Sequence, residues 1–221
     1  MLIMKRIRRW SCVLCLVLLA PAVSMAGTYA DFFKSVQIDN AGMVQSLLAR
    51  GLDPNMIEEE RGDTGLILAL REDSMRVFQV LLNDPGSNLE ARSRNGDTAL
   101  MVAAFKGNLP AVEALLAKDV EVNRPGWTAL HYAAASGNNK IVQLLLDKSA
   151  YIDAESPNKM TPIMMAARGG HIYTVKLLLD EGADATLRNA QGLSAIDMAT
   201  MYKHKDIAEG LVYRLKKAGK L

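Results

Sequence analysis

Apolar residues recur along this chain with the spacing of one face of a helix. Three clusters show the pattern most clearly: Val112/Leu115/Leu116, Val142/Leu145/Leu146 and Val175/Leu178/Leu179. Residues three and four positions apart form one stripe on a helix, so each cluster predicts a short amphipathic helix. A glycine precedes each cluster, at Gly107, Gly137 and Gly170. Because glycine readily adopts the left-handed backbone conformation, we expect it to end one helix and begin the reversal into the next.

The same pattern returns with a period near 33 residues. Thr128, Thr161 and Ser194 are spaced 33 residues apart, whereas Thr98 lies only 30 residues before Thr128. A constant period of this size is typical of arrays in which each repeat is one helix-turn-helix unit.

The repeated segments resemble the ankyrin repeat, whose consensus joins T-P-L-H-x-A-A to G-x-x-x-x-V-x-x-L-L and G-A-D-x-N. Residues 128–134 read T-A-L-H-Y-A-A, residues 161–167 read T-P-I-M-M-A-A, and residues 182–184 read G-A-D. The resemblance implies an all-α ankyrin repeat solenoid of about six repeats, with hairpin-like fingers between them and an atypical cap at each end. The approximate repeats are 28–61, 62–95, 96–125, 126–158, 159–191 and 192–221.

The last repeat carries a run of polar and basic residues that suits a terminal cap. It contains Lys203, His204, Lys205, Asp206, Arg214, Lys216 and Lys217. A solvated helix end with cations near its carboxyl terminus is the preferred interpretation, and a site for an anionic partner is the alternative.

The first 26 residues have the pattern of a secretory signal peptide. Lys5, Arg6, Arg8 and Arg9 precede an apolar, uncharged run over residues 10–20, and residues 24–26 (S-M-A) offer a small-residue cleavage site. The run is too short for a permanent membrane helix, so we expect cleavage after Ala26 and no stable membrane insertion afterwards. Residues 27–221 would then form the exported domain, most naturally by the general secretory route into the bacterial periplasm.

Charge and cysteine content agree with that division. The whole chain has 26 basic and 24 acidic residues, and removing residues 1–26 leaves 22 basic against 24 acidic residues. A slightly acidic domain argues against nucleic-acid binding. Both cysteines, Cys12 and Cys15, belong to the predicted signal, so the exported domain has no thiol and no disulfide.

Candidate catalytic and metal-binding residues are few. His131 falls on the histidine of the family motif, which implies a bond to the backbone of the neighbouring turn, while His171 and His204 follow the interhelical turn and are expected to be exposed. The chain has neither a Gly-X-Ser-X-Gly elbow nor a phosphate-binding loop. The sequence therefore predicts no enzyme, metal or cofactor, and a hydrolase is the disfavoured alternative. The run 58–60 (E-E-E) is interpreted as a solvated finger, with a contact for a basic partner as the alternative.

A candidate partner-binding surface follows from the family resemblance. The fifth and eighth residues from the motif threonine line the concave groove of an ankyrin stack. The fifth residues are Leu68, Val102, Tyr132, Met165 and Met198, and the eighth are Arg71, Phe105, Ala135, Arg168 and Met201. With Tyr202 at its edge, this ladder predicts an exposed apolar and aromatic strip of the kind that binds proteins, although packing in the core is the alternative for part of it.

The shorter step between Thr98 and Thr128 predicts a notch in the array. The finger at residues 123–127 (N-R-P-G-W) has lost three residues relative to the period. Trp127 would either fill that notch or anchor a partner there.

These features predict a non-catalytic, monomeric binding module that holds a protein partner of unknown identity with its finger tips and concave inner-helix face. The arrangement of signal and repeats resembles exported bacterial ankyrin proteins, and that resemblance implies support for an oxidative-stress enzyme such as catalase. The alternative within the binding class is an inhibitor or immunity partner of a toxic exported enzyme.

Overall fold

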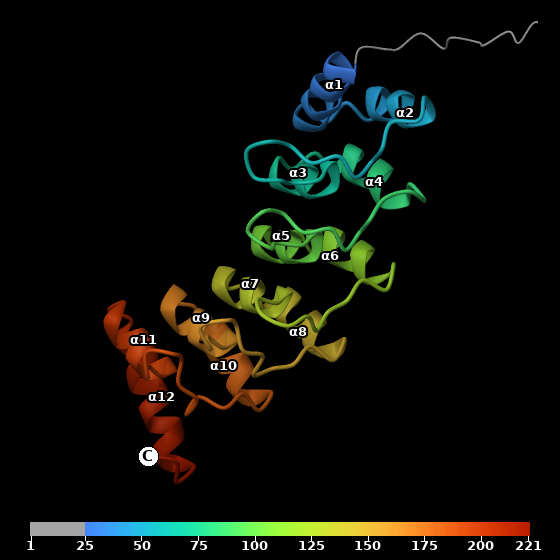
Figure 1. The fold of residues 1–221 in the computed structure, drawn as a ribbon. Helices are drawn as coiled ribbons and strands as arrows, with labels where there is room; N and C mark the ends of the chain where they lie inside the picture. The colour runs from blue at the N-terminus through green and yellow to red at the C-terminus, as the bar shows by residue number, and fades with distance from the viewer. Residues whose placement is uncertain (1–24) are drawn as a thin grey trace, which may run out of the picture.

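A computed structural model describes residues 25–221, which form twelve helices arranged as six successive pairs (Figure 1). The helices are α1 (Met25–Gln37), α2 (Ala41–Ala49), α3 (Gly65–Arg71), α4 (Met75–Asn83), α5 (Ala99–Lys106), α6 (Leu109–Leu116), α7 (Ala129–Ser136), α8 (Asn139–Asp147), α9 (Pro162–Gly169), α10 (Ile172–Asp180), α11 (Ala195–Met201) and α12 (Lys205–Lys217). The predicted all-α solenoid of about six helix-turn-helix repeats is confirmed.

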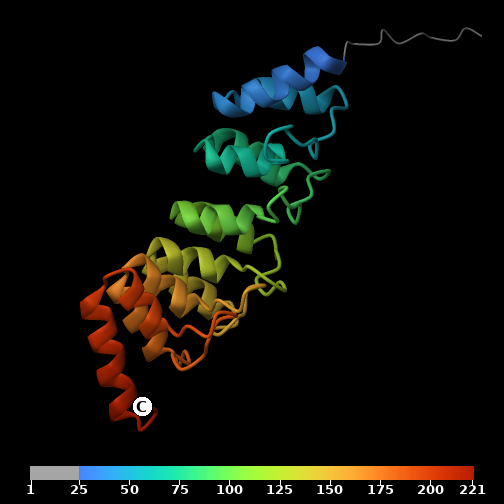
Figure 2. The ribbon, with the colours of Figure 1, turned by 60° about the vertical axis from the view of Figure 1, so that its left-hand side comes forward.

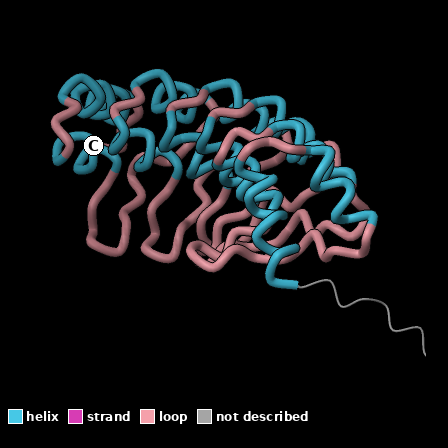
Figure 3. The backbone as a smooth tube through the Cα atoms, turned by 90° about the horizontal axis from the view of Figure 1, so that it is seen from above, coloured by secondary structure: helices cyan, strands magenta, loops and turns pink. Residues whose placement is uncertain are grey.

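The helices form two layers along a curved array (Figure 2). The odd-numbered helices stack on one another as an inner layer, and the even-numbered helices cover them on the outside. The connections between repeats project as fingers from one side of the array, as Figure 3 shows. The concave groove is therefore bounded by the inner helices and the fingers.

The predicted helix boundaries are set by local chemistry. The hydroxyls of Thr64 and Thr98 accept the backbone N–H groups of Ile67 and Met101, which satisfies donors at the first turns of α3 and α5. Helices α5, α7 and α9 end on glycines with φ of 70°, 74° and 78°. The left-handed conformation predicted for Gly107, Gly137 and Gly170 is thus confirmed.

Alanine pairs allow the inner helices to lie close together. The pairs at positions 103–104, 133–134 and 166–167 have no exposed surface. Leucines of the outer layer, such as Leu115 and Leu145, are buried in the same core as these small side chains. The core is accordingly continuous through the array.

The residues that cap the starts of α8, α10 and α12 also tie their repeats to the repeat before. Asn138 donates to the carbonyl of Gly107 at 3.4 Å, His171 Nε2 donates to that of Ala135 at 2.9 Å, and His204 Nε2 donates to that of Arg168 at 3.1 Å. The two histidines are half-buried, so the prediction that they are exposed is wrong. The reason is this bond, which draws each ring onto the turn of the preceding repeat.

The fingers are short hairpins, with one exception. A backbone bond closes the hairpin from Glu58 to Asp63 and from Ser93 to Asp97, and the two later fingers have equivalent bonds. The finger at 117–128 has twelve residues, against fourteen or fifteen in the other fingers. No equivalent bond occurs in it among the described residues. Arg124 instead links it to the preceding finger through an ion pair with Glu90 at 2.7 Å.

The acidic run at 58–60 has a structural use. The carboxylate of Glu58 accepts the backbone N–H groups of Glu60, Arg61 and Asp63 and so shapes the first finger. These bonds hold the pKa of Glu58 below its usual value, although desolvation acts in the opposite direction. The run is on the predicted finger, and its first carboxylate is occupied by that finger's own backbone.

The predicted signal segment lies mostly outside the described residues, which begin with the first turn of α1. Cleavage after Ala26 would remove two residues of this helix. The side chains that fix α1 in the array, including Phe32, Phe33 and Val36, come after that point. In the range 25–221, no helix combines the length and the apolar character that crossing a bilayer requires.

His131 has the structural role that the motif predicts. Its ring is fully buried, Nδ1 accepts the backbone N–H of Thr128 at 3.2 Å, and Nε2 donates to the carbonyl of Met160 at 2.8 Å. A backbone N–H can only donate and a carbonyl can only accept, so these two bonds fix the neutral Nε2–H tautomer. Burial lowers the pKa of His131.

We expect the free energy of unfolding to fall as the pH drops below about 6.5, the ordinary histidine pKa. The unfolded chain then takes up a proton at residue 131 that the folded chain excludes, which costs up to about 1.4 kcal/mol per pH unit. Urea unfolding at pH 7.5 and pH 5.5 measures this. His131→Met, the residue type that Met164 provides at the matching position of the next repeat, is the control. An unchanged pH dependence in that variant would contradict the assignment.

Candidate functional site

The predicted groove residues are exposed at the carboxyl ends of the inner helices. Phe105 is 54% exposed, Met201 56% and Tyr202 42%, and Arg168 is exposed beside them. Arg71, Trp127, Tyr132, Ala135 and Met165 are half-buried. The eighth position of the motif therefore reaches the surface of the groove, as the sequence predicts.

Three residues predicted to line the groove are instead part of the core. Leu68, Val102 and Met198 are only 5%, 3% and 6% exposed. These three side chains belong to the hydrophobic core, whereas Tyr132 and Met165 at the same motif position are half-buried. The predicted continuous apolar strip is thus wrong, and the exposed apolar surface is divided into separate parts.

One of these parts is a hollow that we call the aromatic notch. It is lined by Phe105, Trp127, His131, Tyr132, Ala135 and Met165 and has a volume of about 150 Å³. The rings meet edge to face: Phe105 and Tyr132 have centroids 6.1 Å apart, and Trp127 lies 5.2 Å from His131. Aromatic rings favour this arrangement, so the walls hold one another in place.

The aromatic notch lies beside the short finger. Trp127 is the last residue of that finger before Thr128, the residue that caps α7. Its ring is half-buried and packs on His131 and Tyr132 while forming one wall of the hollow. Trp127 thus packs on the array but does not fill the notch.

A chain of charged and polar groups holds the hydroxyl end of Tyr132 in place. Its hydroxyl donates to Asp97 at 2.5 Å, Asp97 accepts from Arg71 at 2.8 Å, and Arg71 Nε donates to Asp63 at 2.7 Å. We call Asp63, Arg71, Asp97 and Tyr132 the ionic chain. It connects three successive repeats along the floor of the groove.

Burial determines the electrostatics of the ionic chain. Desolvation raises the pKa of Asp63, which is fully buried, against the opposing effect of Arg71. Burial lowers the pKa of Arg71, but its bonds to Asp63 and Asp97 outweigh that effect and raise it. Burial, followed by the bond to Asp97, raises the pKa of Tyr132. The raised pKa of Arg71 is consistent with a charged guanidinium held between two acidic side chains.

Sequence reasoning missed both acidic members of this chain. Asp63 and Asp97 each occur in a Gly-Asp-Thr triplet, at 62–64 and 96–98. The repetition of this triplet immediately before the motif threonine was the available signal. It places a carboxylate at the same finger position in two adjacent repeats, where one arginine can bind both.

A second exposed contact lies at the end of the groove nearest the last repeat. The guanidinium of Arg168 lies over the ring of Tyr202, with its carbon 5.1 Å from the ring centroid. Such a cation–π contact orders both side chains at the surface. Arg168 belongs to the same helix, α9, as Met165, which lines the aromatic notch.

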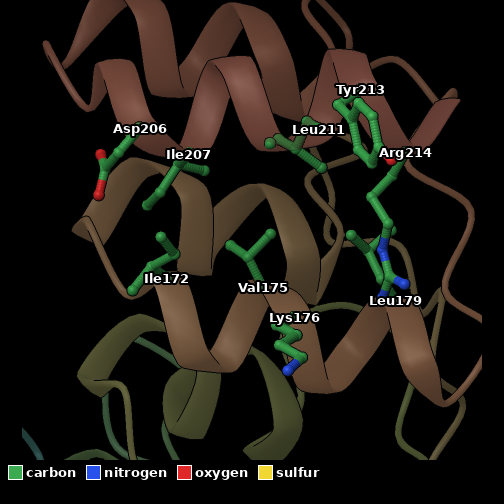
Figure 4. A pocket seen from close by; sticks show the side chains of 10 residues that line it. Ile172, Val175, Lys176, Leu179, Asp206, Ile207, Leu211, Tyr213 and Arg214 are labelled. Carbon is green, nitrogen blue, oxygen red and sulfur yellow. The ribbon is translucent and has the colours of Figure 1, made fainter. Parts of the chain in front are cut away.

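A larger hollow lies outside the groove, between the outer helices α10 and α12. Figure 4 shows Ile172 and Val175 of α10 facing Ile207 and Leu211 of α12 across it. Its volume is about 300 Å³, and Arg214 at its edge forms an ion pair with Asp180. Because this hollow is formed by the outer helices, it is separate from the predicted partner-binding surface in the groove.

The side chains that commonly bind metals are scattered. Within residues 25–221, histidine, aspartate and glutamate do not gather in groups of three or more that could hold an ion.

Comparison with known proteins agrees with this architecture. The family model of ankyrin repeats (3 copies) matches residues 32–125, 77–156 and 151–219. The chain is 35% identical over 176 residues to SH3 and multiple ankyrin repeat domains protein 2 of Homo sapiens, which is 77% of this chain and 10% of that protein. It is 40% identical over 149 residues to Ankyrin repeat and SAM domain-containing protein 6 of Rattus norvegicus, which is 67% of this chain and 14% of that protein. It thus spans about a tenth of the length of these relatives.

We expect Arg71→Met to destabilise the fold by about 2–3 kcal/mol, because it leaves the two largely buried carboxylates of Asp63 and Asp97 without their cation. The matched control is Arg76→Met, which breaks an ion pair with Asp39 in which the arginine side chain is 75% exposed. That change should cost less than about 1 kcal/mol. Urea unfolding of both variants measures the difference, and equal losses would show that the ionic chain has no special role.

Proposed function

The chain belongs to the ankyrin repeat family, whose modules generally mediate protein–protein interaction, and we propose that it binds a partner protein through its concave groove. The aromatic notch and the Arg168–Tyr202 contact would form the centre of the interface. Aromatic and arginine side chains of this kind dominate the energetics of many protein interfaces.

The observation that carries this proposal is the exposed ring of Phe105, which is held in a fixed orientation in the groove. Its ring is 54% exposed, yet it packs edge to face on Tyr132, which the ionic chain holds in place. An exposed aromatic side chain in a fixed orientation loses little conformational freedom when a partner covers it. The groove is therefore preorganised for recognition.

We propose that the groove works by binding without catalysis. Its buried titratable groups are already engaged: Asp97 binds Arg71 and Tyr132, and both ring nitrogens of His131 bind backbone groups. A general base needs a free acceptor within reach of a substrate proton. These residues serve the architecture of the groove, which favours a binding role.

We further propose that residues 1–26 direct export to the periplasm. The support is the basic cluster at 5–9, the apolar run at 10–20, the small residues at 24–26 and the lack of cysteine after residue 26. The relatives described above are animal proteins, so the proposal depends on these amino-terminal features alone. The roles beside an oxidative-stress enzyme such as catalase and as an inhibitor of a toxic enzyme stay predictions.

Mass spectrometry of the amino terminus tests the export proposal. Protein purified from bacterial cells should begin at Gly27, because processing follows Ala26. Protein recovered from the periplasmic fraction with Met1 retained, or processed protein absent from that fraction, would contradict it.

Site-specific photocrosslinking tests the groove. We expect a photoreactive amino acid at position 105, in the groove, to crosslink a partner protein in producing cells. The same amino acid at position 213 is the control, because Tyr213 is 66% exposed and lines the outer hollow between α10 and α12.

The variant with Phe105→Glu and Met165→Glu should then lose the partner while keeping its helical content and unfolding midpoint. A partner that crosslinks from position 213 alone, or that the double variant still binds normally, would place the interface elsewhere.

A further inference from the structure

We propose that the aromatic notch holds one phenylalanine- or leucine-sized side chain of a partner segment that has acidic residues on both sides of that anchor. This inference depends on the proposed function, because it specifies the chemistry of the partner that the groove would bind. It follows from three properties of the notch: its size, the state of its polar groups and the charges beside it.

The volume of the notch sets the size of the anchor. About 150 Å³ is available between Phe105, Trp127, Tyr132 and Met165. A protein cavity of about this volume can hold a benzene molecule. One aromatic or branched aliphatic side chain therefore fits, and a larger group would have to displace the walls.

The polar groups around the notch favour an uncharged, apolar occupant. The Tyr132 hydroxyl donates to Asp97, and the two nitrogens of His131 bind the backbone of Thr128 and Met160. A polar ligand group entering the notch would lose water without gaining these atoms as partners, which is costly. The sulfur of Met165 and the three rings are well suited to apolar contact.

The flanking charges argue against a cation in this aromatic site. Lys106 follows Phe105 directly and is held on the groove because its ammonium donates to the carbonyl of Arg71 at 2.9 Å. Arg168 lies one helical turn after Met165 and is oriented by the Tyr202 ring. The ion pairs found in the described part of the chain involve neither of these cations.

Charge complementarity therefore identifies the residues next to the anchor. The carboxylate beneath the notch, on Asp97, is already bound by Arg71 and Tyr132 and offers little attraction to a cation. Lys106 of α5 and Arg168 of α9 instead carry positive charge on the inner helices on either side of α7, the same two helices that provide Phe105 and Met165. A partner segment with carboxylates before and after its anchor would neutralise both.

Three capped pentapeptides test this inference on the purified protein. They have the sequences Asp-Gly-Phe-Gly-Asp, Gln-Gly-Phe-Gly-Gln and Lys-Gly-Phe-Gly-Lys. Binding is followed by NMR of methyl-labelled methionine, with the Met165 signal assigned by its loss in Met165→Leu. We expect the acidic peptide to shift the Met165 signal with a Kd about tenfold lower than that of the basic peptide, because two exposed pairs change from attraction to repulsion. The difference should shrink between about 0.05 M and about 0.5 M salt.

Two variants separate the anchor from the charges. Phe105→Ser removes one exposed wall of the notch and should weaken all three peptides. Lys106→Glu combined with Arg168→Glu should reverse the preference, so that the basic peptide binds best. The matched control is Lys140→Glu combined with Lys176→Glu, two exposed positions on the outer helices, which should leave the order unchanged. Unfolding midpoints of all variants check that the fold is kept.

The outcomes distinguish this inference from the proposed function. Equal binding of the three peptides, or tightest binding of the basic one, would overturn the inference. So would the absence of any Met165 shift at millimolar peptide. If position 105 still crosslinks a partner in those cases, the groove is an interface with a different partner chemistry. If that crosslink is missing as well, the proposed function fails with it.

Discussion

The packing of each repeat on its neighbours is the constraint on which the rest of the structure depends. A pair of helices of seven to nine residues cannot bury an apolar face by itself, so the core exists only where successive pairs stack. The alanine pairs of the inner helices make that stacking close. The groove inherits its shape from this spacing, because the exposed residues lie at the ends of the same helices.

Bonds between repeats then convert stacking into a defined surface. The ionic chain crosses three repeats beneath the aromatic notch, and the bonds of Asn138, His171 and His204 cross the turns behind it. Buried charge is expensive unless each group is paired, and here one guanidinium serves two carboxylates while a tyrosine hydroxyl completes the set. As a result, the ring of Tyr132 in the groove cannot turn freely when no partner is bound.

Much of this architecture could be predicted from the sequence. The period, the glycines that end the inner helices and the role of His131 all follow from local chemistry that repeats along the chain. The errors arose where the outcome depends on a neighbouring repeat. Leu68, Val102 and Met198 are buried in the core, whereas Tyr132 and Met165 at the same motif position are half-buried. The prediction that His171 and His204 are exposed was wrong for the same reason, since the carbonyl groups that their rings bind lie in the preceding repeat.

The short finger at 117–128 shows how a regular array acquires an individual site. The aromatic and methionine residues of the notch occupy positions that every repeat possesses, and the notch opens beside the one finger that is shorter than the rest. In evolutionary terms, a deletion of a few residues is enough to distinguish one repeat from its neighbours. Restoring those residues would lengthen the finger beside the notch while leaving the helices that carry its other walls unchanged in length.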